Sequence, residues 1–297
     1  SIIDEMMKDI SESKFYMTKI AQPIIFSIQV SLVELWKSWG ISCEAMVGHS
    51  VGEIAAAYCS GAISLEDALK IVYHRSVLMD SILGLGRMAA IQASINEVEE
   101  VIEKFEGKVC VGAYNGPESI VISGDSKAVE KAVEEFQNKK IHCKMLEVEY
   151  AFHSHQTEDL VERLNESLKG IKSDIPTIDI YSTLTGKLAD IKSFNSKYWG
   201  MQMRNPVRFD KTIEALLEDG FNMFIEMNQK PILSGDIMKI SSNLNKQCIV
   251  IPAISKSQAG YPEMRLALAR GYSNGYQVNW SGVFPLNTYV KIPTYSW

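Results

Sequence analysis

The stretch MVGHSVGEIAAAY, residues 46–58, places a serine, Ser50, between two glycines in a G-x-S-x-G pattern. Glycines at these positions let a strand and a helix approach closely, so that the serine hydroxyl projects from a tight turn at the start of the helix. Residues 43–47 are predicted to form a short buried strand and residues 53–59 a helix. This order indicates a nucleophile elbow, although the five-residue pattern alone is equally consistent with a structural turn.

The backbone around Ser50 also predicts how an oxyanion would be held. The amide of Val51 would donate a hydrogen bond to negative charge developing on a substrate oxygen, and the dipole of the following helix favours the same charge. One such donor stabilises a transition state by about 3 kcal/mol. A serine hydroxyl is a weak nucleophile at its ordinary pKa, so the site also needs a general base.

Five histidines are the candidates for that base. His49 is adjacent to the serine, and neighbouring side chains on a sharp turn point apart. His74 is predicted to pack in the middle of a helix, and His142 to be exposed at the start of a strand. His153 and His155 lie where a strand gives way to a helix. Ligand sites of open parallel sheets gather at the carboxyl ends of strands, so position alone leaves both of these open.

Arg75 lies in the mostly apolar helical segment IVYHRSVLM. A cation among apolar side chains is unfavourable unless it has a partner. One interpretation is structural, with the side chain reaching to solvent or pairing with Asp67 or Asp80. The other is functional, because the planar guanidinium can hold a substrate carboxylate by two parallel hydrogen bonds.

Two predicted helices flank the elbow. The first spans residues 22–39, with Pro23 in its first turn. The second runs from the N-cap Ser64 to about Ile82 and opens with a capping box in which Asp67 reaches back to the cap.

Residues 86–148 have a different pattern, in which short strands alternate with amphipathic helices. The predicted order is strand, helix, strand, strand, helix, strand, with NGPES as the hairpin between the middle strands. This βαββαβ order is typical of a ferredoxin-like arrangement. We therefore expect a small ferredoxin-like domain, residues 86–148, inserted into a core formed by residues 1–85 and 149–297.

After the insert the pattern returns to longer units. Helices are predicted at residues 156–170, 210–220 and 263–275, and strands at residues 177–183, 222–227 and 247–254. Strands that alternate with helices predict a mostly parallel sheet covered on both faces. The expected fold class is therefore α/β, with a hydrolase-like core that carries the elbow and the ferredoxin-like insert.

The composition narrows the class of protein. A chain of 297 residues with 46% hydrophobic residues can bury a sizeable core. A net charge of -6, with the basic residues scattered, argues against nucleic-acid binding.

The five cysteines lack metal-ligand spacing and indicate free thiols in a reducing compartment. No run reaches the ~18 apolar residues of a membrane span, and no signal peptide begins the chain. We expect a cytoplasmic protein with no metal site and no membrane partner.

Five motifs can be read together. They are GHSVGE at 48–53, HRSVLM at 74–79, YAFHSH at 150–155, RNPVRF at 204–209 and IPTYSW at 292–297. In this order and at these separations they resemble the malonyl-CoA:acyl carrier protein transacylase family, specifically the acyltransferase domain of polyketide and fatty acid synthases. The resemblance covers nearly the whole chain, and the ordered set is far more specific than any one motif.

The resemblance implies a role for each matching residue. Ser50 would take the acyl group from coenzyme A as an ester, with His153 as general base and the Val51 amide as oxyanion donor. The backbone carbonyl of Gln202 would hold His153 in the correct tautomer, so that the pair is a dyad rather than a triad. Arg75 would clamp the free carboxylate of a malonyl unit.

The implied reaction is ping-pong transfer from malonyl-CoA to the phosphopantetheine thiol of an acyl carrier protein, with no bound cofactor. The implied partners are that carrier protein and a neighbouring ketosynthase domain of the same chain. Members that load malonyl commonly have H-A-F-H, and members that load methylmalonyl Y-A-S-H; this chain has Y-A-F-H, ending at His153. Phe152 would fill the space of a 2-methyl group, and Val51 after the nucleophile also resembles the members that load malonyl. Malonyl is therefore expected, although Tyr150 matches the members that load methylmalonyl.

The sequence departs from the family pattern in two places. The family's G-Q-G-x-Q loop, which supplies a second oxyanion amide, lies upstream of the first residue, so we expect an excised piece of a longer chain whose own activity is open. Residues 226–234, EMNQKPILS, replace E-V-G-P-H-P-V-L-S and alter a turn rather than a catalytic group. The closing motif resembles the linker that follows these domains.

Two alternatives remain: a serine esterase or hydrolase, and a non-catalytic scaffold within a synthase.

Overall fold

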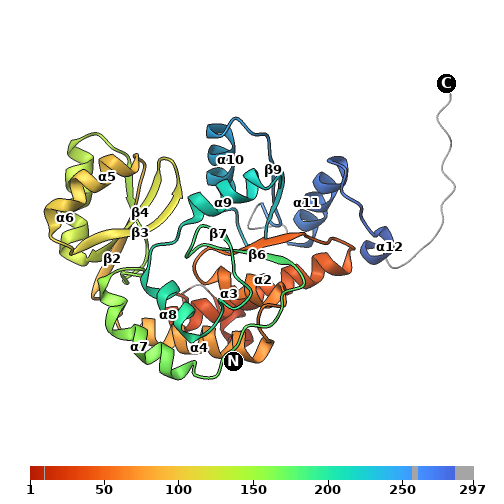
Figure 1. Ribbon diagram of the computed structural model, residues 1–297, viewed down its shortest axis with the longest axis horizontal. Helices are drawn as coiled ribbons and strands as arrows, with labels where there is room; N and C mark the ends of the chain where they lie inside the picture. The colour runs from red at the N-terminus through yellow and green to blue at the C-terminus, as the bar shows by residue number, and fades with distance from the viewer. Residues whose placement is uncertain (10, 256–259, 285–297) are drawn as a thin grey trace.

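A computed structural model describes residues 1–9, 11–255 and 260–284. It contains a larger α/β body and a smaller sheet domain, drawn in yellow at one side of the molecule in Figure 1. The closing motif IPTYSW, residues 292–297, lies outside the described residues.

The elbow has the predicted order of elements. Ser50 stands between strand β1 (Ala45–Val47) and helix α3 (Gly52–Cys59). Gly48 has no room for a side chain, because a Cβ there would lie 2.2 Å from the carbonyl carbon of Gly52. The close approach of strand and helix therefore requires glycine at this first position of the motif.

Two long helices, α2 (Thr18–Ser38) and α4 (Leu65–Asp80), pack against α3 and against each other. Ser64 caps α4 as predicted, because its hydroxyl accepts a hydrogen bond from the backbone N–H of Asp67 at 3.1 Å. Only this half of the predicted capping box forms.

The predicted start of the first helix was wrong. Helix α2 begins at Thr18, so Pro23 lies inside the helix rather than in its first turn. A tertiary contact explains the earlier start: the Tyr150 hydroxyl accepts a hydrogen bond from the Thr18 backbone N–H at 3.1 Å. This bond satisfies one of the amide groups that a helix N-terminus leaves without an internal partner.

The strands of the larger body form two small sheets. In the first, β1 pairs in parallel with β6 (Asp179–Ser182), and β7 (Lys187–Leu188) adds an antiparallel edge. In the second, β8 (Met223–Glu226) pairs in parallel with β9 (Ile249–Pro252).

The predicted parallel pairing is thus present, but one continuous sheet is not formed within the described ranges. The ladders extend over only two to four residue pairs and supply few hydrogen bonds. Apolar side chains that include Tyr181 of β6 and Phe224 of β8 join the two sheets in one core instead.

The remaining helices complete the larger body and include all three that were predicted after the insert. They are α1 (Ile2–Met6), the 3-10 helix η2 (His155–Thr157), α7 (Glu158–Ser167), α8 (Ser196–Arg204), α9 (Phe209–Glu218), α10 (Ser234–Asn243), α11 (Tyr261–Ser273) and α12 (Trp280–Val283). None of the described helices has the length and apolar character needed to cross a bilayer.

The elements of the smaller sheet domain run from Gly86 to Met145. Its elements are β2 (Gly86–Ile91), α5 (Ile95–Ile102), the 3-10 helix η1 (Glu103–Phe105), β3 (Val109–Gly116), β4 (Ser119–Asp125), α6 (Ser126–Asn138) and β5 (Cys143–Met145). This is the βαββαβ order that the sequence predicts, and the antiparallel strands lie in the order β3-β4-β2-β5.

The two faces of this four-stranded sheet have different neighbours. One face packs on α5 and α6 through residues such as Val98 and Phe136. The other face, which includes Val121, joins the core of the larger body. The insert leaves and re-enters the larger body at one place, where the backbone N–H of Gly84 donates to the carbonyl of Glu149 at 2.7 Å.

Candidate active site

Ser50 is held on a strained turn. Its φ angle of 52° is in the left-handed region, which is unfavourable for a residue with a side chain. The hydrogen bond from the Glu53 backbone N–H to the Ser50 carbonyl, 3.0 Å, closes the first turn of the helix beyond it. The Val51 amide donates to no other described residue, so it is free to donate to a substrate oxygen.

His153, and not His155, meets the serine. Ser50 Oγ lies 2.8 Å from His153 Nε2, and His153 Nδ1 lies 2.9 Å from the backbone carbonyl of Asn205. Because a carbonyl oxygen only accepts, Nδ1 must carry the proton and Nε2 must present its lone pair to the serine hydroxyl. The imidazole is therefore in the tautomer of a general base.

The expected orienting role of Gln202 needs correction. The carbonyl within hydrogen-bond distance of Nδ1 is that of Asn205, after the end of α8, and the carbonyl of Gln202 is a secondary influence that also raises the pKa of His153. The Gln202 side chain instead donates to the Ser50 carbonyl at 2.8 Å. The helix ends before Asn205, which frees its carbonyl from internal bonding and lets it reach the imidazole.

The environment keeps His153 neutral. His153 is 3% exposed, and three influences lower its pKa to about 3: burial, then the charge of Arg75, then the charge of His49. The hydrogen bonds to the carbonyls act in the opposite direction but are outweighed. At neutral pH the base is therefore unprotonated and ready to accept the serine proton.

Arg75 is 1% exposed and points at the nucleophile. Its Nη2 donates to Ser50 Oγ at 3.1 Å, and its Nη1 donates to the side-chain carbonyl of Gln22. Burial lowers its pKa to about 10, so it remains charged at neutral pH. Nε has no hydrogen-bond partner among the described residues.

No described carboxylate forms an ion pair with Arg75. Of the two structural partners considered from the sequence, Asp80 pairs instead with Lys19 at 2.9 Å, and Asp67 forms no ion pair within the described ranges. The geometry thus leaves a buried cation beside the serine with no direct ion pair among the described residues, although the more distant carboxyl of Glu53 raises its pKa. A ligand carboxylate in contact with the guanidinium would offset the cost of burying this charge.

A cavity of about 200 Å³ opens onto these groups. Its lining includes Ser50, Val51, Arg75, Tyr150 and Phe152, and the remaining wall comes largely from the first turns of α2 and the segment before it. Ser50, its neighbour Val51, the cation Arg75 and both predicted specificity residues therefore line one cavity.

Tyr150 and Phe152 form one wall of the cavity. Their rings stack with centroids 4.9 Å apart and planes 14° apart. The Tyr150 hydroxyl donates to Asp80 at 2.9 Å, and burial raises its pKa to about 12. Because Tyr150 is fixed at its hydroxyl, the stacked ring of Phe152 has a rigid backing.

Glu53 is a site residue that the sequence reading missed. It is fully buried and its carboxylate accepts hydrogen bonds from Thr183, Tyr198 and Gln202. Burial raises its pKa. An acid in the first turn of an otherwise alanine-rich helix was the available signal. It ties the elbow helix to β6 and α8, and so fixes the position of Ser50.

The other histidines form no hydrogen bond with Ser50 or His153, although His49 helps to lower the pKa of His153. His49 Nε2 lies 2.8 Å from Asn115 Oδ1 in the insert, and His155 Nε2 lies 3.0 Å from Asp125. His74 packs edge-on against Tyr73, and His142 is exposed.

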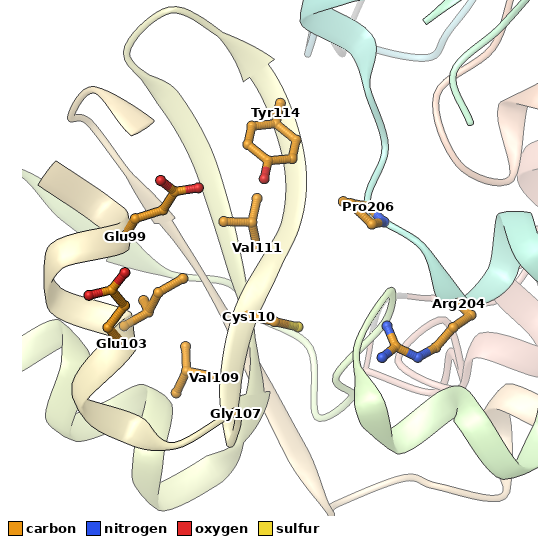
Figure 2. A pocket seen from close by; sticks show the side chains of 10 residues that line it. Glu99, Glu103, Gly107, Val109, Cys110, Val111, Tyr114, Arg204 and Pro206 are labelled. Carbon is orange, nitrogen blue, oxygen red and sulfur yellow. The ribbon is translucent and has the colours of Figure 1, made fainter. Parts of the chain in front are cut away.

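A second, more open groove of about 440 Å³ lies between the insert and the segment that follows α8. Figure 2 shows Cys110 projecting from β3 toward Arg204 and Pro206 across this groove, with Glu99 and Glu103 on the side of α5. Within the described residues no cluster of three or more histidine, cysteine or acidic side chains has the geometry of a metal site.

Comparisons with known proteins identify the family of this chain. The family described as the acyl transferase domain matches residues 2–275. Mycoketide-CoA synthase of Mycobacterium tuberculosis is 33% identical over 280 residues, which is 93% of this chain and 7% of that protein. Erythronolide synthase EryA3 of Saccharopolyspora erythraea is 34% identical over 276 residues, 93% of this chain and 8% of that protein. The chain thus spans less than a tenth of these relatives.

Solved structures show the same similarity. The acyltransferase domain from module 8 of the salinomycin polyketide synthase superposes with a TM-score of 0.91 at 27% identity, covering 95% of this chain and 67% of that one. The malonyl CoA-acyl carrier protein transacylase of Coxiella burnetii gives a TM-score of 0.73 at 26% identity, covering 86% and 80%. The chain belongs to the acyl transferase domain family, and the proteins it resembles include polyketide synthases and their acyltransferase domains.

Proposed function

We propose that this domain moves a malonyl unit from coenzyme A to the phosphopantetheine thiol of an acyl carrier protein through an ester on Ser50. The observation that carries the proposal is the buried guanidinium of Arg75, which has no direct ion pair among the described residues and lies 3.1 Å from the nucleophile. A malonyl thioester has a free carboxylate one methylene from its reactive carbonyl. A cation this close to Ser50 suits a short acyl group that ends in a carboxylate.

In the first half-reaction Ser50 Oγ attacks the thioester carbonyl carbon while His153 Nε2 takes its proton. The Val51 amide donates to the oxyanion of the tetrahedral intermediate. The intermediate collapses with cleavage of the carbon–sulfur bond, and the departing thiolate takes the proton from Nε2. The products are malonyl-Ser50, free coenzyme A and neutral His153.

In the second half-reaction the phosphopantetheine thiol of the carrier protein attacks the ester carbonyl. His153 Nε2 accepts the thiol proton and returns it to Ser50 Oγ as the carbon–oxygen bond breaks. The hydrogen bond to the Asn205 carbonyl stabilises the imidazolium formed in each half, in the role that a carboxylate has in a triad. No step needs a metal or a redox cofactor.

The wall at Phe152 supports a preference for malonyl over methylmalonyl. Its ring lines the cavity next to Ser50 and is held by stacking on Tyr150. A 2-methyl group would need the space that this ring fills. One methyl group in such a pocket is worth about 1 to 3 kcal/mol, so the preference is a matter of degree.

The proposal includes the setting of the domain. The larger body is hydrolase-like and the smaller one a ferredoxin-like insert, with residues 86–148 as its bounds. An acyl carrier protein and a ketosynthase domain of the same synthase are the proposed partners. The relatives, of which this chain matches only a small part, are synthases by name.

Intact-mass spectrometry tests the proposal. The protein is incubated with malonyl-CoA or acetyl-CoA, and the adduct is measured against time in the natural sequence and in Ser50→Ala. We expect a malonyl adduct that forms faster than an acetyl adduct and is absent from the variant. A carrier protein with its phosphopantetheine arm should then remove the adduct.

Two results would contradict the proposal. Rapid hydrolysis of neutral esters with no transfer to the carrier protein would identify an esterase. Binding of the carrier protein with no adduct in either form would identify a scaffold without acyl transfer.

A further inference from the structure

The backbone that carries the base is as strained as the nucleophile's. His153 has a φ angle of 56°, in the left-handed region, and its side chain is buried. Such a conformation is unfavourable for a residue with a Cβ and persists only where the surroundings fix it. The contacts that fix it are therefore part of how the base is positioned.

One of those contacts comes from the insert. Ser123, on β4, is fully buried, and its hydroxyl donates to the carbonyl of Phe152 at 2.6 Å. That carbonyl belongs to the peptide immediately before His153 and has no other hydrogen-bond donor among the described residues. The Ser123 hydroxyl therefore fixes the orientation of the peptide from which the base projects.

The acceptor for the base is held by the same sheet. Val207, two residues after Asn205, donates its N–H to the carbonyl of Gly112 at 3.0 Å and accepts from the N–H of Tyr114 at 2.8 Å. Ala113 and Val207 form a parallel bridge. Strand β3 thus fixes the segment whose carbonyl receives the Nδ1 proton of His153.

Because Gly112 has no side chain, the hydrogen bond between Ser123 and Phe152 can form beside the contact of strand β3 with Val207. A Cβ at this position would lie 3.1 Å from Cβ of Ser123 and 3.3 Å from the carbonyl oxygen of Phe152. These separations are tighter than ordinary contacts, so a larger residue would push the Ser123 hydroxyl and the Phe152 peptide apart. Figure 2 shows the part of β3 around Val111 beside the segment that carries Arg204 and Pro206.

We propose that Ser123 is a positioning residue for catalysis, and that the insert sets the distance from His153 Nε2 to the nucleophile through it. Strand β4 fixes the peptide of the base, and strand β3 fixes the acceptor of its second nitrogen. The insert thus helps to hold His153 in position relative to Ser50, in addition to lying next to the cavity. The expected effect on the rate of malonyl loading rests on the proposed function, whereas the expected effect on the position of the His153 ring does not.

The test compares Ser123→Ala with Ser241→Ala. Ser241, on α10, is a matched control because its buried hydroxyl also donates to a carbonyl, that of Lys246 at 2.7 Å. We expect Ser123→Ala to lower the maximal rate of malonyl-Ser50 formation by about 10- to 100-fold, since small displacements of catalytic groups have effects of this size. The malonyl-CoA concentration giving half the maximal rate should be unchanged, and Ser241→Ala should load at the natural rate.

Proton NMR supplies a readout that does not depend on malonyl. The Nδ1 proton of His153, donated to a carbonyl, should give a downfield signal, assigned by its loss in His153→Gln. We expect Ser123→Ala to shift or broaden this signal and Ser241→Ala to leave it in place. If the protein loads no malonyl at all, the proposed function fails while this signal still tests the positioning role.

Further variants cover a failure of Ser123→Ala to fold. Gly112→Ala should give the same loss of rate and the same change in the signal, whereas Gly235→Ala, with no atom within 4 Å of the added Cβ, should give neither. Ser123→Thr retains the hydroxyl and should load at least three-fold faster than Ser123→Ala or, if that variant does not fold, than Gly112→Ala. Natural loading with an unmoved Nδ1 signal in Ser123→Ala, or equal losses in Ser123→Ala and Ser241→Ala, would overturn the inference.

Discussion

The hydroxyl of Ser50 accepts a hydrogen bond from the guanidinium of Arg75 at 3.1 Å. The same oxygen lies 2.8 Å from the neutral imidazole of His153. The cation therefore acts twice: it holds the oxygen in place, and its charge helps to keep the base unprotonated. A substrate carboxylate that neutralises this charge would make the base stronger as the substrate arrives.

Replacing Arg75 should separate malonyl from acetyl loading. In Arg75→Ala the loss of charge-assisted hydrogen bonds to the carboxylate is worth about 2 kcal/mol, or roughly 30-fold in kcat/KM for malonyl-CoA. Acetyl-CoA has no carboxylate, so its rate should fall much less. Arg75→Lys keeps the charge without the planar fork, so its kcat/KM for malonyl-CoA should lie between those of the natural protein and Arg75→Ala. Equal losses for both substrates in steady-state assays would contradict the clamp.

The buried state of His153 should make the fold sensitive to acid. Its pKa falls from 6.5 in the unfolded chain to about 3 in the folded protein, so between these values the unfolded chain binds the extra proton. The stability present above pH 6.5 is lost as the pH falls toward 3, with a slope of about 1.4 kcal/mol per pH unit from this residue.

His153→Gln tests that assignment. Urea unfolding at a series of pH values should show a smaller dependence on pH in the variant, by about the same slope. His155→Gln is the control, since His155 is partly exposed and bonded to Asp125. An unchanged slope in His153→Gln would show that the ring is not buried in its neutral form.

The two glycines of the elbow should differ in their tolerance of a side chain. Gly48→Ala would place its Cβ 2.2 Å from backbone atoms of Gly52 and should destabilise the fold by about 3 kcal/mol or more. Gly52→Ala meets only the side-chain amide of Gln29, at 3.4 Å, inside a helix. Its effect on the urea midpoint should be below about 1 kcal/mol. Similar losses from both variants would be inconsistent with the described turn.

Phe152 should govern which extender unit is accepted. Phe152→Ala removes the ring that fills the cavity beside Ser50, so the ratio of methylmalonyl to malonyl loading should rise by about 10-fold. A competition between the two coenzyme A esters, read by intact mass, measures this ratio. Phe105→Ala in the insert, remote from this cavity, is a control for general loss of packing. A ratio that stays constant in Phe152→Ala would place the specificity wall elsewhere.

The sequence predicted the local elements well because their signals are local. The elbow needs glycine at 48, and the alternation of strands and helices in the insert is regular, so both were found. Position alone did not separate His153 from His155, because both follow the same predicted strand. The family resemblance pointed to His153, and the structure places its ring beside Ser50 and that of His155 beside Asp125.

Features set by distant parts of the chain were missed. The orienting carbonyl belongs to Asn205 because α8 ends just before it, which no side-chain pattern records. The start of α2 at Thr18 depends on the Tyr150 hydroxyl. The role of Glu53 depends on donors more than a hundred residues away, including Thr183.

The hydrogen bond between Gly84 and Glu149, which brings the two ends of the insert together, has a consequence for the order of folding. Parallel pairing of β1 with β6 joins Ala45 to Asp179, and the insert lies between them. If the insert folds first, its closed ends roughly halve the flexible chain that must be looped, which favours closure by about 0.6 kcal/mol. The insert's hairpin contacts are close in sequence and form rapidly, whereas the nucleophile and its base meet only after long-range closure. The dyad should therefore assemble late, once the insert is already in place.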